Sequence, residues 1–212
     1  MTQSRRGLLA ARLYVITPDA APDVVVDIAT AAARGGADIV QLRHKTLARG
    51  ELLDLARRVR AVTAGAGVLF VVNDHVDIAL LSEADGVHLG PDDLSIASAR
   101  RVAGDRLLIG ASASNPEAAR LAIAAGADYL GSGPAFATPI KSEKKVIGPK
   151  GVAAIATEVG PEVPVFAIGG INETNVAELI AEGVRRVCVI RAVSGAPDPE
   201  QAARHLRAML NG

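Results

Sequence analysis

The stretch Asp38-Ile39-Val40-Gln41-Leu42-Arg43-His44-Lys45 sets the pattern from which the fold of this chain can be interpreted. Its first five residues are typical of a short buried strand, and the three that follow are strongly polar. Because side chains alternate along a strand, Gln41, Arg43 and Lys45 share one face, and their neighbours point the other way. Two cations and an amide at the end of a buried strand are costly unless an anion binds there. The stretch therefore predicts a site for a phosphate or diphosphate group.

The apolar half of this pattern recurs along the whole chain. Eight short strand-like runs lie at residues 13–17, 38–42, 68–73, 85–89, 107–111, 128–132, 164–168 and 187–190. The segments between them have helical spacing, as in the predicted helix face of Leu52, Leu55, Val59 and Val62. Strands and helices therefore alternate from end to end, without a linker or a low-complexity segment.

This alternation predicts the fold class. Apolar runs that are buried on both faces are typical of a parallel sheet covered by helices, which is an α/β architecture. Eight such units favour a single-domain (β/α)8 TIM barrel over residues 1–212. An open, doubly wound sheet is the alternative, but no GxGxxG loop follows the first strand.

The composition excludes several classes of protein. The 212 residues are 50% apolar but only 2% aromatic, so the core must be aliphatic. Lys plus Arg and Asp plus Glu both number 23, and this balance argues against a protein that binds nucleic acid. The lone Cys188 excludes an intrachain disulfide and is expected to be a small buried core residue. No signal peptide or membrane-spanning run is visible, so we expect a cytoplasmic protein. A homo-oligomer is compatible with the sequence.

Unusual polar residues and glycines follow the predicted strands one after another. In a (β/α)8 barrel the active site lies at the carboxyl ends of the strands, so these residues should meet at one rim. They are Gln41, Arg43 and Lys45 at the end of the second strand, Asn73 and Asp74 at the end of the third, Asp93 after the fourth, Ser112 at the fifth, Thr138 and Lys141 after the sixth, Gly169 and Gly170 after the seventh, and Ile190 and Arg191 at the eighth.

Asp74 and Asp93 follow neighbouring strands, so their carboxylates can converge. Two hard oxygen ligands beside a site for phosphate oxygens predict a Mg²⁺ position. The alternative is that each aspartate caps the helix that follows it, because Asp is favoured at that position.

Gly169-Gly170 precedes a helix that we expect to begin near Asn172-Glu173. Glycines there let backbone N–H groups approach a phosphate at the helix N-terminus, although a simple tight turn is the alternative. The long polar connection at residues 138–150 is typical of a flap over a substrate, and Lys141 stands closest to the strand end. A structural role is expected for His88, and no spacing indicates a nucleophilic side chain.

These segments together resemble the thiamin phosphate synthase family. The likeness runs from Tyr14 to Val193 and rests on Gln41-x-Arg43-x-Lys45, Asn73-Asp74, His88-Leu89-Gly90-x-x-Asp93, Gly133-Pro134-x-Phe136-x-Thr138 and Ala167-Ile168-Gly169-Gly170-Ile171. The resemblance implies a transferase that joins hydroxymethylpyrimidine diphosphate to hydroxyethylthiazole phosphate. No partner other than these small molecules is implied.

The resemblance also implies a role for each matching residue. Arg43, Lys45, Asn73 and Lys141 would hold the diphosphate, with Ser112 near it. Asp74 and Asp93 would bind Mg²⁺, and Gln41 would contact the pyrimidine. Thr138, Gly169, Gly170, Ile190 and Arg191 would lie around the thiazole phosphate.

Three positions depart from the family pattern. Ile140 stands where a second threonine is common, Arg191 where a serine is common, and Ser114 where a histidine or threonine is frequent. Two alternatives follow: a thiazole tautomerase, which would need a histidine at the position of Ser114, and a catalytically silent paralogue that binds thiazole phosphate. A phosphate-binding barrel isomerase would share Gly169-Gly170 but would not explain the two aspartates.

Overall fold

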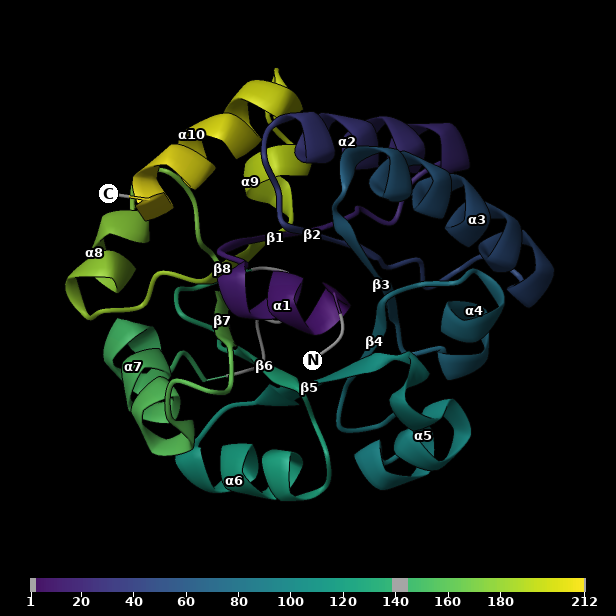
Figure 1. The fold of residues 1–212 in the computed structure, drawn as a ribbon. Helices are drawn as coiled ribbons and strands as arrows, with labels where there is room; N and C mark the ends of the chain where they lie inside the picture. Colours follow the sequence, from purple (N-terminus) through teal and green to yellow (C-terminus); the bar gives the residue numbers. More distant parts are fainter. Residues whose placement is uncertain (1–2, 139–144, 212) are drawn as a thin grey trace.

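A closed barrel of eight parallel strands forms the centre of the computed structural model, which describes residues 3–138 and 145–211 (Figure 1). The strands are β1 Leu13–Ile16, β2 Ile39–Leu42, β3 Leu69–Asn73, β4 Gly86–Leu89, β5 Leu108–Ala113, β6 Tyr129–Ser132, β7 Val165–Ile168 and β8 Val187–Val189. Each pairs in parallel with its neighbours in sequence, and β8 closes on β1. The predicted (β/α)8 barrel is confirmed, and the open sheet is excluded.

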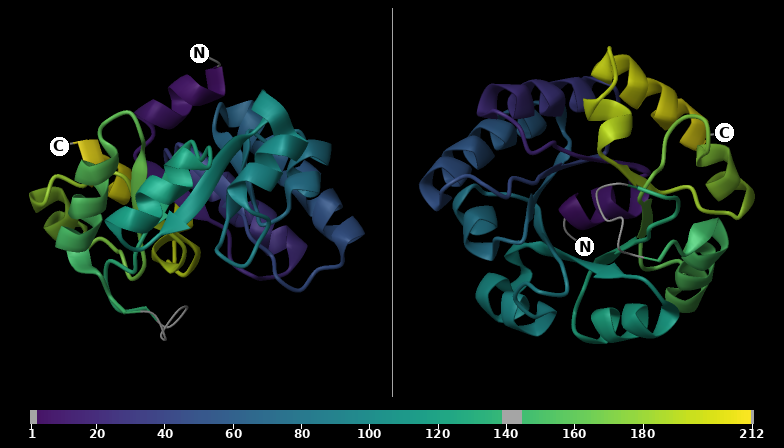
Figure 2. Two further views of the ribbon diagram at one scale, coloured as in Figure 1. Left: turned by 90° about the horizontal axis from the view of Figure 1, so that it is seen from below. Right: turned by 180° about the vertical axis from the view of Figure 1, so that it is seen from behind.

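Helices surround the barrel, as both turned views in Figure 2 show. They are α2 Pro22–Arg34, α3 Arg49–Ala66, α4 Val76–Leu81, α5 Ile96–Ala103, α6 Pro116–Ala124, α7 Gly148–Val159, α8 Val176–Ala181, α9 Arg191–Ser194 and α10 Pro199–Asn211, with a 3-10 turn η1 at Gly104–Arg106. The predicted face of α3 is slightly wrong: Thr63 is buried, whereas Val62 is only partly so. The buried Thr63 hydroxyl has a hydrogen-bond partner, because it donates a hydrogen bond to the backbone oxygen of Val59. In the described part of the chain, every helix is too short or too polar to cross a lipid bilayer.

Two apolar cores follow from strand alternation. The larger lies between the outer faces of the strands and the helices, and includes Val40 and Leu42 of β2. The smaller fills the barrel interior and includes Ile39 and the buried Cys188. Cys188 is therefore a core residue, as expected. The alternation predicted for β2 is also confirmed, because the side chains of Ile39 and Gln41 point inward.

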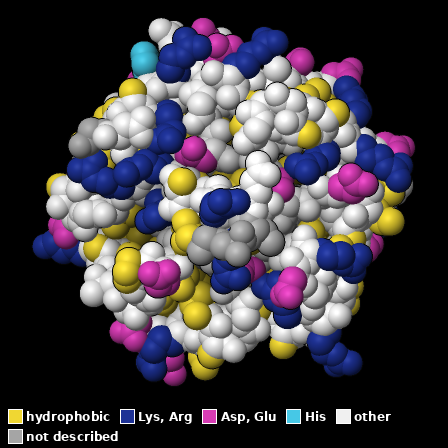
Figure 3. Space-filling view, viewed as in Figure 1, with side chains coloured by type: hydrophobic (Ala, Val, Ile, Leu, Met, Phe, Trp, Pro, Cys, Tyr) yellow, Lys and Arg dark blue, Asp and Glu magenta, His cyan; other side chains and the backbone are white. Residues whose placement is uncertain are grey.

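A helix that sequence reasoning did not identify, α1 at Gln3–Ala10, lies across the amino-terminal end of the barrel (Figure 1). Its Leu8 is 2% exposed and joins the interior core. Two ion-pair or hydrogen-bond contacts hold the helix to strand starts: Ser4 Oγ donates to Asp85 at 2.9 Å, and Arg5 lies 3.4 Å from Asp128. The face that carries α1 shows charged side chains of both signs interspersed (Figure 3), in keeping with the balanced net charge.

Three aspartates that directly precede strands, Asp38, Asp85 and Asp128, have a structural role. Asp38 accepts a hydrogen bond from the backbone N–H of Leu13 at 2.9 Å. Asp85 and Asp128 accept equivalent bonds, each at 2.9 Å, from the backbone N–H groups of Phe70 and Ile109, which are the second residues of β3 and β5. Each carboxylate also accepts a hydrogen bond from an arginine: Asp38 from Arg207, Asp85 from Arg60, and Asp128 from Arg100. Because these groups are satisfied locally, the amino-terminal end of the barrel is a stabilising region and the reactive groups must be sought at the other end.

Candidate active site

Gln41 is the last inward-facing residue of β2 and is 2% exposed. Its amide nitrogen donates a hydrogen bond of 2.7 Å to the Tyr14 hydroxyl. Arg43 follows the strand end, where its backbone N–H donates to the buried hydroxyl of Thr17 at 3.2 Å. Gln41 therefore lies within the barrel, and the backbone of Arg43 lies at its rim.

Lys45, Asp74 and Asp93 meet at the carboxyl-terminal rim. The Lys45 ammonium lies 2.5 Å from Asp74 Oδ2. The carboxyl groups of Asp74 and Asp93 are within hydrogen-bonding range of each other. Asp93 is held by the backbone N–H of Gly90, which donates to its Oδ2 at 2.7 Å. The predicted convergence of the two carboxylates is thus present.

Neither aspartate caps a helix. His75 occupies the N-cap position of α4, and Ser95 that of α5, where the Ser95 hydroxyl accepts the Ser98 N–H at 3.2 Å. Asp74 instead has a left-handed backbone with φ of 65°, a conformation that non-glycine residues rarely adopt. The capping interpretation is wrong for both residues, so their carboxylates need another explanation.

The two carboxyl groups have opposite pKa shifts. Burial acts to raise the pKa of Asp74, but the hydrogen bond and charge of Lys45 outweigh it and hold that pKa below its ordinary value. Burial and the neighbouring Asp74 raise the pKa of Asp93. Adjacent carboxylates that resist joint ionisation favour a bound cation. The pair could hold a hard divalent ion such as Mg²⁺, with the other ligands from water and phosphate oxygens, since the described residues contain no group of three or more His, Cys, Asp or Glu ligands.

Asn73, His88 and Ser112 line the next part of the rim. Asn73 and His88 are partners in the β3–β4 register, so they lie side by side on the inward face. His88 Nε2 lies 3.2 Å from the Ser112 hydroxyl. Its ring packs on that of Tyr129, with 5.7 Å between centroids. Sequence reasoning expected a structural role for His88 and missed its contact with Ser112, which strand alternation could have indicated.

The loops after β6 and β7 pack tightly on each other. The Phe136 N–H donates to the Gly169 carbonyl at 2.9 Å. Gly170 has φ of 67°, and a Cβ there would lie 2.5 Å from the Ala137 carbonyl oxygen, so only glycine fits. Thr138 follows Ala137 in the chain, and its predicted part in the site stays a prediction. Lys141 and Ile140 lie outside the described residues.

The helix expected to begin near Asn172-Glu173 begins later, at Val176. A turn precedes it, in which the Asn172 N–H donates to Asn175 Oδ1 and Asn175 Nδ2 donates to the Gly170 carbonyl, both at 2.9 Å. Asparagine side chains compete with helical hydrogen bonds in this way, so the helix start is delayed. Gly169-Gly170 therefore precedes a helix, but that helix begins at Val176, later than the predicted start near Asn172-Glu173.

A short helix that sequence reasoning missed, α9, begins at Arg191 directly after β8. Ile190 is its N-cap residue and accepts the Ser194 N–H at 2.9 Å. The Arg191 side chain is exposed. Four residues carry too little periodicity to signal a helix, which explains the omission.

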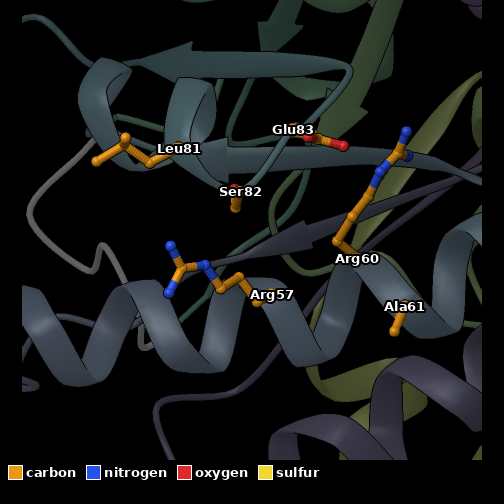
Figure 4. Close-up of a pocket in the computed structure, with 6 residues that line it drawn as sticks. All are labelled: Arg57, Arg60, Ala61, Leu81, Ser82 and Glu83. Carbon is orange, nitrogen blue, oxygen red and sulfur yellow. The ribbon is translucent and has the colours of Figure 1, made fainter.

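A surface hollow of about 290 Å³ lies away from this rim (Figure 4). Arg57 and Arg60 extend into it from α3, opposite the turn that follows α4. Its lining residues are Arg57, Arg60, Ala61, Leu81, Ser82 and Glu83. Because Arg60 is paired with Asp85 at the start of β4, the hollow belongs to the amino-terminal half of the barrel and is separate from the candidate site.

Known proteins share both the sequence and the fold. Residues 13–193 match the family described as thiamine monophosphate synthase. A thiamine-phosphate synthase of Methanoregula boonei is 46% identical over 198 residues, which cover 92% of this chain and 91% of that protein. One from Gloeobacter violaceus is 44% identical over 207 residues, which are 98% of this chain but 60% of that protein. The chain thus spans less than two thirds of some relatives it matches.

A solved structure agrees with these sequence matches. A thiamine phosphate pyrophosphorylase from Pyrococcus furiosus superposes with a TM-score of 0.86 and 39% identity, covering 98% of this chain and 97% of that one. The rim residues described above lie within the matched range of 13–193. From this match and this likeness, we conclude that the chain belongs to the thiamine monophosphate synthase family.

Proposed function

We propose that this chain is a cytoplasmic transferase that makes thiamin phosphate. It would condense 4-amino-2-methyl-5-hydroxymethylpyrimidine diphosphate with 4-methyl-5-(2-hydroxyethyl)thiazole phosphate and release diphosphate. The observation that carries the proposal is the carboxylate pair of Asp74 and Asp93 held beside Lys45 at the rim. A diphosphate site needs both cations and a place for a metal ion, and this rim offers them within one cluster.

The diphosphate would lie against Arg43, Lys45 and Asn73, with Lys141 as a further contact. Arg43 and Lys45 supply fixed positive charge, and Asn73 supplies an amide donor on the adjacent strand. Mg²⁺, held by Asp74 and Asp93, would neutralise charge on the diphosphate and help it to leave. The chain's own contribution is orientation, because β2, β3 and β4 deliver these groups side by side.

The thiazole phosphate would bind across the rim, at Thr138, Gly169, Gly170 and the backbone of Ile190 and Arg191. Gly170, packed under Ala137, leaves no side chain between that phosphate and the loop backbone. In the reaction, the bond between the pyrimidine methylene carbon and the diphosphate oxygen breaks, and its electron pair leaves with the diphosphate. The thiazole nitrogen then forms the new bond with its lone pair. Such a reaction depends on positioning and charge stabilisation, and it needs no nucleophilic side chain.

A coupled assay tests the proposal: purified protein, Mg²⁺ and both precursors, with thiamin phosphate detected as fluorescent thiochrome. Asp74→Asn and Arg43→Gln should each lower turnover about 100-fold or more, because Arg43→Gln removes positive charge that faces the leaving group and Asp74→Asn removes a carboxylate that would hold Mg²⁺. Matched controls are Asp54→Asn and Arg57→Gln on the exposed face of α3, which should leave turnover unchanged.

The same experiment separates the alternatives. Folded protein that binds thiazole phosphate without forming product would indicate a silent paralogue. A rate of product formation that does not depend on Mg²⁺ and is unchanged by both rim substitutions would refute the assigned site. The exposed Ser114, in place of a histidine, gives a tautomerase no acid–base group at that position.

A further inference from the structure

The loop at residues 43–48, between β2 and α3, carries Arg43 and Lys45 and is held in place by side chains. Four of its backbone N–H groups donate to side-chain atoms: Arg43 to Thr17, Lys45 to Asp19, Leu47 to His44 and Ala48 to Glu51. Two of the acceptors, Thr17 and Asp19, belong to the preceding loop, between β1 and α2. The position of the β2–α3 loop therefore depends on the β1–α2 loop.

The imidazole ring of His44 lies between these two loops, and the side chain is only 6% exposed. Its Nε2 lies 3.0 Å from the carbonyl oxygen of Ala20, which can only accept, so Nε2 carries a proton and donates it. Its Nδ1 lies 3.2 Å from both the Leu47 nitrogen and Asp19 Oδ1. In the neutral ring Nδ1 accepts from Leu47, and in the protonated ring it donates to Asp19. The bond to Ala20 links the two loops in both states.

The same loop contacts determine where Lys45 stands. Asp19 Oδ2 accepts the Lys45 backbone N–H at 3.2 Å, next to the contact between Asp19 and His44. The Lys45 side chain is 50% exposed and has a flexible stem, so its own packing does little to direct it. Its ammonium nevertheless lies 2.5 Å from Asp74 Oδ2, across the rim on the next loop. The fixed backbone on either side of Lys45 accounts for this placement.

We propose that His44 is a positioning residue, whose hydrogen bond to Ala20 fastens the β2–α3 loop to the β1–α2 loop and so directs the Lys45 ammonium to the diphosphate. This inference rests on the proposed function and adds a residue whose ring faces the neighbouring loop. Without the bond, the loop gains conformations in which Lys45 is withdrawn from the rim. The apparent affinity for diphosphate then falls in proportion to the fraction of protein that keeps Lys45 in place.

Two substitutions of His44 separate the roles of its two ring nitrogens. His44→Gln places an amide N–H near the position of Nε2, so it can keep the bond to Ala20. His44→Asn has a shorter side chain that reaches only the position of Nδ1, so it can keep the contact with Leu47 but loses the link to Ala20. His205→Gln is the matched control, because His205 is exposed on α10. KM is measured for each precursor, and calorimetric binding of inorganic diphosphate with Mg²⁺ provides a readout that does not need turnover.

His44→Asn should raise both the Kd for inorganic diphosphate and the KM for the pyrimidine diphosphate about tenfold, as for one lost hydrogen bond. His44→Gln and His205→Gln should stay close to wild type in both quantities. The KM for thiazole phosphate should stay unchanged in all three variants. A loss of diphosphate affinity in His44→Gln as large as that in His44→Asn, or equal affinity in His44→Asn and wild type, overturns the positioning role while the proposed function stands.

A double-mutant cycle tests whether His44 acts through Lys45. In a Lys45→Ala background, His44→Asn should cause no further loss of diphosphate affinity, because the group that it positions is gone and Arg43 keeps its own bond to Thr17. Additive losses overturn the inference. If wild type forms no product, the proposed function fails, and the diphosphate affinities still decide the role of His44. Wild type that binds no diphosphate overturns both.

Discussion

Gly110→Ala should destabilise the barrel from its interior. The added Cβ would lie 2.1 Å from Tyr129 Cζ and 2.4 Å from its hydroxyl oxygen, far inside van der Waals contact. The ring cannot move away easily, because Phe166 packs against its other side. Overpacking of this kind costs about 1–3 kcal/mol. Displacing the ring also breaks its hydrogen bond with Tyr14, which adds about 1 kcal/mol.

Urea and thermal unfolding measure this effect. For a chain of this length, a loss of about 2–4 kcal/mol corresponds to a fall of about 4–16 °C in Tm. Gly65→Ala is the matched control: it makes the same substitution in α3, where no atom lies within 4 Å of the new Cβ. It should stabilise the protein by up to about 1 kcal/mol, because alanine favours the helix.

A double-mutant cycle isolates the contact itself. In a Tyr129→Ala background the clash is gone, so Gly110→Ala should become neutral or slightly stabilising by filling part of the cavity. If Gly110→Ala costs the same in both backgrounds, the destabilisation does not come from the ring, and the account of the packed interior is refuted.

Two further predictions concern opposite ends of the barrel. In the metal-free protein, Asp93→Asn should raise stability near neutral pH, because the raised pKa of Asp93 means that its ionised form opposes Asp74 in the folded state. As pH falls through that raised pKa, Asp93 takes up a proton and the wild type becomes more stable relative to the variant, so the advantage of Asp93→Asn should shrink in acid. Urea unfolding of both proteins across this pH range measures the difference in unfolding free energy. A difference that grows in acid would contradict the reasoning. At the other end, Leu8→Ala should cost about 2–4 kcal/mol in unfolding free energy, because Leu8 of α1 is 2% exposed and closes the interior core. A cost close to zero would show that α1 is not part of the folding unit.

The sequence allowed the barrel to be predicted because each strand–helix unit carries its own pattern. Every predicted strand overlaps an observed one, with ends that differ by no more than two residues. Local capping also supports the pattern: Gly36 ends its helix region with φ of 88°. Information of this kind lies within a few residues and does not depend on distant parts of the chain.

The features that were missed depend on contacts far apart in sequence. Helix α1 spans eight residues, and a helix of that length is not stable alone. It forms where Leu8 enters the interior core and Ser4 contacts Asp85, a partner 81 residues away. The Tyr14–Gln41 bond joins two strands in the same way, and no pattern within either strand indicates it. Alternation placed Gln41 inward, but the direction of its amide is a tertiary property.

The aspartates show why the site required the structure. Asp38 and Asp128 directly precede strands, and Asp74 and Asp93 follow strands, so all four were equally conspicuous in the sequence. At the strand starts, Asp38 accepts backbone N–H bonds at 2.8 and 2.9 Å, so its charge is satisfied within the protein. Asp74 and Asp93 instead face each other, and Asp74 does so from a backbone with φ of 65°. A fold that keeps two carboxylates in mutual repulsion sacrifices stability there, and the arrangement is best explained by a ligand whose positive charge relieves the repulsion.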